Sequence, residues 1–62
     1  MTNNNLHNLM TQMIEEQKSV WRIENHYTNE APTPEEKMFW QELAEAKQKT
    51  IAELRELIKK EI

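Results

Sequence analysis

The stretch Asn29-Glu30-Ala31-Pro32-Thr33-Pro34-Glu35-Glu36 lies in the middle of the chain and decides how it folds. Because proline disfavours the α-helical region for the residue that precedes it, Ala31 and Thr33 are expected to be extended. Thr33 is then a helix N-cap, with Pro34 at the first helical position and Glu36 at the third. This Thr-x-x-Glu arrangement is a capping box, and it predicts that a second helix begins here.

The sequence on either side of this stretch predicts an all-α fold, a two-helix antiparallel hairpin. Glycine is absent, and alanine, leucine, glutamate, lysine and glutamine are frequent, which favours long helices. Glycine-rich loops that hold phosphate groups are excluded for the same reason. We expect a single domain over residues 1–62, with a frayed N-terminus over 1–4 that supplies Asn4 or Asn5 as a cap, a first helix over 5–28, a turn over 29–33 and a second helix over 34–60.

The composition limits the partners that we expect. The formal net charge is −3, and the one adjacent pair of basic residues, Lys59-Lys60, is explained by the dipole of the helix that it ends. Nucleic acid is therefore not an expected partner. No apolar run approaches the roughly 20 residues that a membrane span needs, and the Asn-rich start does not have the pattern of a signal peptide. We expect a cytoplasmic protein that does not bind membranes.

Apolar residues recur with a heptad period in both halves, as in helices that pack side by side. In the register that places Val20 opposite Leu43, Glu16 and Lys47 interrupt the two stripes at the same level. The sequence predicts an ion pair between them that sets the register, and the alternative is that both side chains turn out to solvent at the edge of the seam. The stripes are Leu6, Leu9, Met13, Val20, Ile23 and Tyr27 in the first half, and Trp40, Leu43, Leu54 and Leu57 in the second, where Thr50 is a further interruption.

The apolar arc of each helix is wider than one partner helix can cover. Phe39 and Trp40 are adjacent and point about 100° apart, so one can enter the seam while the other faces elsewhere. Such surplus apolar surface favours packing against a second chain over a ligand pocket. We expect a homodimer that forms a four-helix bundle with twofold symmetry, with a dimer of dimers left open. The predicted interface residues are Ile14, Trp21, Phe39, Trp40, Ile51 and Ile58.

We find no pattern that predicts catalysis. The two histidines, His7 and His26, lack a second histidine or cysteine at helical spacing, so no metal site is expected. Ser19 is the only serine and has no partner that would activate it. The glutamates are explained as solvated helix faces. The sequence therefore predicts neither an enzyme nor a protein with a cofactor.

The stretch from Tyr27 to Ile58 resembles half of a ferritin-like, rubrerythrin-type domain. The resemblance rests on the rhythm Tyr-x-x-x-Ala, turn, and then Phe39-Trp40-x-x-Leu43-Ala44-Glu45-Ala46-Lys47-Gln48-Lys49-Thr50. The positions of that family's Glu-x-x-His iron ligands carry Lys47 and Thr50 here, and neither residue suits iron. The glutamate of the family's first helix falls near Ile14, with Glu16 as the nearest acid. The resemblance therefore implies a shared architecture without the metal site.

Three functions follow from these patterns as hypotheses. The first is a small, non-enzymatic protein-interaction module that acts as a homo-oligomer and binds another protein, with regulation as one role that it could have. The second is a metal- or small-ligand-binding four-helix bundle of ferritin-like descent, which would need Glu16, Glu24 or His26 to converge across a dimer. The third is a structural spacer or assembly subunit. We favour the first, because the other two need features that the sequence does not offer.

Overall fold

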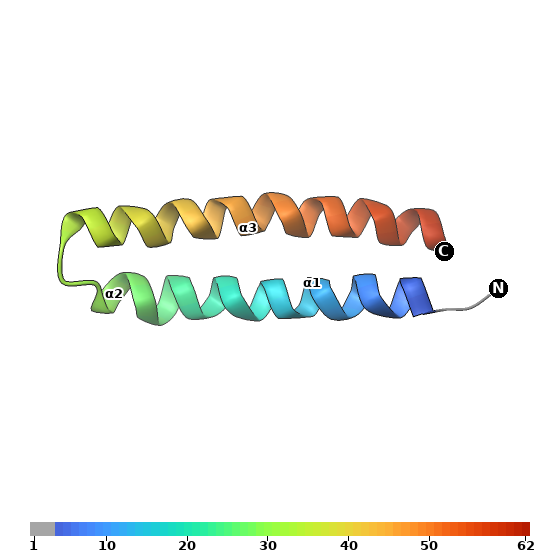
Figure 1. Ribbon diagram of the computed structural model, residues 1–62, viewed down its shortest axis with the longest axis horizontal. Helices are drawn as coiled ribbons and strands as arrows, with labels where there is room; N and C mark the ends of the chain where they lie inside the picture. Colours follow the sequence, from blue (N-terminus) through green and yellow to red (C-terminus); the bar gives the residue numbers. More distant parts are fainter. Residues whose placement is uncertain (1–3) are drawn as a thin grey trace.

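The computed structural model describes residues 4–62, which form two helical rods lying side by side in opposite directions (Figure 1). The predicted all-α hairpin is therefore confirmed, and no strand occurs within residues 4–62. The molecule extends over 50 × 15 × 11 Å. The first rod consists of α1 (Asn4–Arg22), the π-helical turn η1 (Ile23–Tyr27) and α2 (Thr28–Glu30), and the second rod is α3 (Pro34–Glu61).

The turn between the rods is shorter than predicted. The first rod runs on to Glu30, two residues beyond the expected end, and leaves Ala31, Pro32 and Thr33 as the connection. Ala31 (φ −65°, ψ 128°) and Thr33 (φ −130°, ψ 154°) are extended, as their positions before proline predict. No residue from 4 to 62 has a positive φ, so the connection needs no glycine.

Thr33 is the N-cap of α3, as predicted. Its hydroxyl accepts a hydrogen bond of 3.1 Å from the backbone N–H of Glu36. A complete capping box has a second hydrogen bond, in which the Glu36 carboxylate accepts from the Thr33 backbone N–H. That bond does not form within residues 4–62, so only one of the two bonds is present. The predicted cap of the first helix is wrong, because Asn4 and Asn5 already lie inside α1. The position before Asn4, like the rest of residues 1–3, lies outside the described residues.

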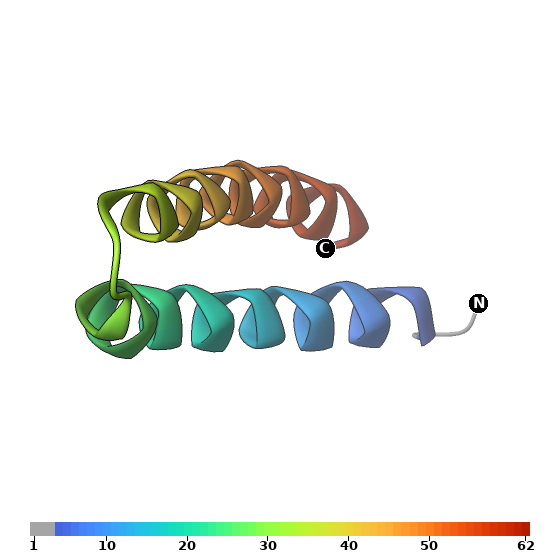
Figure 2. The same cartoon turned by 60° about the vertical axis from the view of Figure 1, so that its left-hand side comes forward.

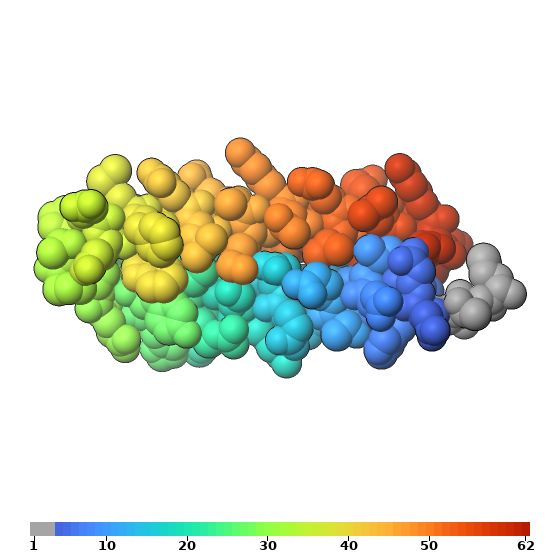
Figure 3. Space-filling model, in the orientation of Figure 1, coloured from blue at the N-terminus to red at the C-terminus, as the bar shows by residue number. Residues whose placement is uncertain are grey.

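The core is a thin seam between the rods, and the views in Figures 2 and 3 show the rods next to each other along their length. Its most buried members within residues 4–62 are Val20, Ile23, Ala44 and Ile51, each 5% exposed or less. On α3 the seam is centred on Ala44 and Ile51, which are seven residues apart, because residues at that spacing lie on one face of a helix. Small Ala44 also lets the two helix axes approach each other.

This position of the seam corrects two sequence predictions. Ile51 was expected between two chains, but it is 4% exposed inside a single hairpin and has no free surface for a partner. Leu57 was expected in the seam, but it is 45% exposed. Both errors have one cause, since the predicted stripe on the second helix is rotated by part of a turn from the observed one. Ile58, another predicted interface residue, is half-buried along the seam.

The π-helical turn η1 interrupts the heptad pattern of the first rod. The backbone N–H of Thr28 donates to the carbonyl of Ile23, five residues back, so this turn holds one residue more than an α-turn. As a result Thr28 is half-buried at the seam, while Tyr27, the predicted seam residue, is 38% exposed. Two asparagine side chains donate hydrogen bonds to backbone carbonyls in this region. Asn25 Nδ2 donates to the Trp21 carbonyl at 2.8 Å, and Asn29 Nδ2 donates to the Asn25 carbonyl at 3.1 Å.

Candidate functional site

An ion pair joins the two rods near the middle of the seam. Lys47 Nζ on α3 donates to Glu16 Oε1 on α1 at 2.8 Å. The second carboxylate oxygen of Glu16 accepts a hydrogen bond of 2.8 Å from Gln12 Nε2. The Lys47 and Glu16 side chains are 24% and 16% exposed, so they lie at the seam edge rather than in open solvent. The contact that the predicted register implies is therefore present.

The surroundings of Glu16 favour its ionised form. The hydrogen bond from Lys47, followed by the one from Gln12, lowers the pKa of Glu16 below its ordinary value of 4.5. A general acid or base works best with a pKa near the working pH, and this carboxylate is shifted the other way. Both of its oxygens already accept hydrogen bonds. The geometry thus suits a structural contact between helices.

The structure does not gather the residues that a metal site would need. Within residues 4–62, no group of three histidine, cysteine, aspartate or glutamate side chains is close enough together to hold a metal ion. Glu16, Glu24 and His26 are therefore not brought into such a group within one chain. The ring of His26 packs edge-on against Trp21, with ring centroids 5.2 Å apart, and His7 Nε2 lies 3.5 Å from the Thr11 hydroxyl.

Aromatic rings collect near the turn end of the hairpin. Trp40 is half-buried, and its ring centroid lies 4.9 Å from that of Tyr27 and 5.2 Å from that of Phe39. Phe39 itself is 58% exposed. The expectation that one member of the Phe39-Trp40 pair enters the seam while the other faces elsewhere is confirmed. Trp21, which is 57% exposed, lies apart from these three rings.

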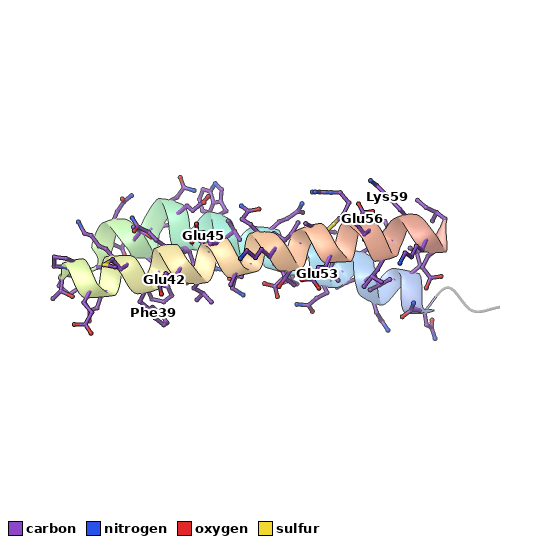
Figure 4. All side chains as sticks on the ribbon, turned by 90° about the horizontal axis from the view of Figure 1, so that it is seen from above. Phe39, Glu42, Glu45, Glu53, Glu56 and Lys59 are labelled. Carbon is purple, nitrogen blue, oxygen red and sulfur yellow. The ribbon has the colours of Figure 1, made fainter. Side chains whose placement is uncertain are left out.

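The predicted interface residues that remain exposed lie on two different sides of the hairpin. Met10, Ile14 and Trp21 recur at intervals of four and seven residues, which places them on one face of α1. Glu24, one turn after Trp21, lines an open groove together with Glu45 of α3. Figure 4 shows Glu45 and Phe39 pointing to opposite sides of α3. The sequence therefore misassigned them to one interface: Ile14 and Trp21 are on one side, and Phe39 is on the other.

The groove has a volume of about 650 Å³ and is open to solvent. Its walls carry three carboxylates and no basic side chain. Sequence reasoning missed it, because its shape depends on the π-helical turn that places Glu24 and Thr28 beside α3. The lining residues are Glu24, Thr28, Met38, Gln41, Glu42, Ala44, Glu45 and Gln48.

No family model, curated protein or solved structure matches this chain. The ferritin-like resemblance therefore stays an expectation from the sequence. Within residues 4–62, no helix is both long enough and apolar enough to cross a membrane.

Proposed function

We propose that this protein is a small, non-enzymatic interaction module that acts as a homodimer, in which two hairpins form a four-helix bundle. The observation that carries the proposal is the imbalance between core and surface. Within residues 4–62, four side chains form the buried core, whereas eight large apolar side chains are more than a third exposed. The exposed set is Met10, Ile14, Trp21, Tyr27, Met38, Phe39, Leu57 and Ile62.

Small size strengthens the argument for a second chain. A chain of about 60 residues buries only about 60% of the surface that it exposes when unfolded, and is therefore marginally stable alone. Disulfides, a frequent remedy, are excluded because the sequence has no cysteine. Packing a second hairpin on the open side of the first would cover exposed apolar surface and supply the missing stability. We propose that the apolar surface left over after dimerisation binds another protein.

Sedimentation equilibrium between about 1 and 100 µM tests the proposal, with tryptophan emission recorded on the same samples. We expect the mass of a dimer, and an emission maximum that moves to shorter wavelength as the dimer forms, because a tryptophan leaves water. A Trp40→Phe variant retains Trp21 alone and identifies the reporter. A single-chain mass across the whole concentration range, with unchanged emission, would contradict the proposal.

A further inference from the structure

The side of the hairpin that carries Trp21 has a distinct pattern of charge. We name it the Trp21 face, and it comprises Met10, Ile14 and Trp21 of α1 with Gln41, Gln48, Arg55 and Lys59 of α3. Gln41 and Gln48 line the groove with Glu24, the next turn after Trp21. Arg55 follows Gln48 by two turns and Lys59 follows Gln41 by five, so all four α3 residues lie on this side.

The two ends of the Trp21 face carry opposite charge. Toward the turn, the groove presents Glu24, Glu42 and Glu45, and the one basic residue of α3 on this side is Lys37, five turns before Arg55. Toward the chain ends, α1 contributes no acid at all, because residues 4–14 contain neither aspartate nor glutamate. There α3 supplies Arg55 and Lys59 with one acid, Glu56, so this end has a small positive net charge (Figure 4). Lys59 has an ion-pair partner of its own in Glu56, at 3.2 Å, whereas Arg55 forms no ion pair within residues 4–62.

We infer that a second copy of this chain docks on the Trp21 face in the antiparallel sense, so that the acidic end of each copy meets the basic end of the other. A twofold axis perpendicular to the rods exchanges the two ends, and it brings Glu45 of one copy level with Arg55 of the other. The midpoint between these positions is level with Met13, next to Ile14, in the register that the Glu16–Lys47 contact defines. Met10 and Ile14 therefore lie near the twofold axis, with the Glu45–Arg55 pairs on either side of them, and Trp21 lies farther from the axis than these pairs.

The opposite side of α3 does not have this complementarity. Phe39 lies between Glu35 and Glu42, which line a second small hollow with it, and Glu42 stands between the two sides because it also lines the groove. Glu53, two heptads after Phe39, is acidic in the other half of the same side, and Lys60 stands next to Glu61 at its tip. A twofold axis midway between Glu42 and Glu53 on this side would place these two acids opposite each other. Like charges opposed at an interface disfavour association, so the Phe39 side fits a second copy poorly.

This inference rests on the proposed self-association and adds its face and its direction. Charge reversal tests both. In the antiparallel dimer each substitution alters two symmetric contacts, so Glu45→Lys and Arg55→Glu should each raise the dimer dissociation constant about tenfold. The double variant E45K/R55E restores opposite charges across the interface and should dimerise like the original chain. An equimolar mixture of the two single variants should form heterodimers, because every contact is again between opposite charges.

Matched control substitutions distinguish a dimer that uses the Trp21 face from one that uses the Phe39 side. Glu53→Lys makes the same change of charge on the same helix, on the Phe39 side, and should leave the dissociation constant unchanged (Figure 4). Trp21→Ala should weaken the dimer while Phe39→Ala does not, and both residues are exposed enough for folding to survive. Raising the salt concentration should weaken the dimer, because attractive pairs are screened.

Three outcomes would overturn the inference. In the first, Phe39→Ala and Glu53→Lys abolish the dimer, whereas Trp21→Ala and Glu45→Lys do not. The dimer then uses the Phe39 side, and the proposed self-association remains valid. A dimer that tightens with salt and ignores both single charge reversals is parallel, since it pairs Glu45 with Glu45 and Arg55 with Arg55. A chain that is a monomer at every concentration overturns the proposed self-association itself.

Discussion

Lys47 and Glu16 are 31 residues apart in sequence, and their hydrogen bond of 2.8 Å joins the two helical rods at the one level where both apolar stripes are interrupted. A partly buried ion pair of this kind seldom stabilises a fold more than apolar residues would. Its better supported use is to favour one register over others, as polar residues do in coiled coils. Sliding the helices by one turn would leave each charge against apolar surface. The pair therefore favours a single alignment of the hairpin.

Replacing Lys47 by methionine should destabilise the hairpin by about 1–3 kcal/mol, because Glu16 would remain at the seam without its donor. The cost lies between that of an exposed pair and that of a fully buried one, in keeping with the partial exposure of both side chains. Replacing Glu16 and Lys47 together by apolar residues should be neutral or stabilising. Urea denaturation of the four chains of this double-mutant cycle measures the coupling free energy.

Lys49 is the matched control for Lys47, since it is exposed on the same helix and forms no ion pair within residues 4–62. Replacing Lys49 by methionine should change the free energy of unfolding by less than about 0.5 kcal/mol. A coupling energy near zero between Glu16 and Lys47 would show that their contact does not help to hold the register.

The stability of the hairpin should depend on pH through Glu16. Its pKa is lowered in the folded chain, so the folded state binds fewer protons than the unfolded state as the group titrates. The stabilisation is complete above the ordinary pKa of 4.5 and is lost as the pH falls through the lower, folded value. The difference in unfolding free energy between the original chain and Glu16→Gln should therefore shrink from pH 7 toward pH 3. A difference that stays constant between pH 7 and pH 3 would contradict this role of Glu16.

The hydroxyl of Thr33 should contribute through its hydrogen bond to the Glu36 backbone. Replacing Thr33 by alanine is expected to cost about 1 kcal/mol, as is typical for the loss of an N-cap. Thr33→Ser keeps an oxygen in the same place and should retain most of the stability. The comparison is made by thermal unfolding followed by circular dichroism. Equal melting temperatures for the alanine and serine variants would mean that the cap contributes nothing.

The position of the seam on α3 predicts that Ile51 contributes more to stability than Leu57, which is the reverse of what the sequence pattern implies. Ile51→Ala removes a side chain that is 4% exposed and should cost about 2–4 kcal/mol. Leu57→Ala, at a position 45% exposed, should cost less than about 1 kcal/mol in the monomer. Denaturation at low protein concentration keeps dimerisation out of the measurement. The reverse order of the two costs would support the seam that was expected from the sequence.

The π-helical turn should tolerate a deletion that the rest of the first rod does not. Deleting Asn25 removes the surplus residue of η1, lets the turn close as an α-turn and keeps Thr28 at the seam, so the stability should change by about 1 kcal/mol or less. Deleting Lys18 in the regular part of α1 rotates everything before it by about 100° and takes Met13 out of the seam. That variant should lose most of its helical circular dichroism signal. Equal losses for the two deletions would contradict this role of η1.

The turn and the ion pair could be predicted from the sequence because each depends on local rules. Two prolines with Thr33 between them fix the backbone at the start of α3 whatever else the chain does. The Glu16–Lys47 contact needs only a heptad count in both directions from the turn. These features depend on spacing along the chain, and spacing is what a sequence displays directly.

The π-helical turn and the division of the apolar surface into two sides could not be predicted in the same way. No residue in Ile23–Tyr27 predicts a π-helical turn. The hydrogen bond from the Thr28 N–H to the Ile23 carbonyl differs little in energy from the ordinary α-helical bond, so packing decides which of the two forms. The extra residue in this turn then rotates Tyr27 away from the seam. Phe39 and Trp21 were assigned to one interface because a heptad pattern identifies apolar positions without saying which way each rod is turned.

The start of α1 and the end of α3 lie together at one end of the hairpin, where the Asn5 side chain donates a hydrogen bond to the Glu61 carboxylate (Figure 1). A protein fused after Ile62 would therefore leave a single hairpin at the end where α1 begins, and the turn end would stay free. In the antiparallel dimer that we infer, the two fused proteins would instead depart from opposite tips. The dimer would then hold its two fused proteins roughly 33 Å apart, because Glu61 of each copy lies about 11 residues from the twofold axis at a rise of 1.5 Å per residue.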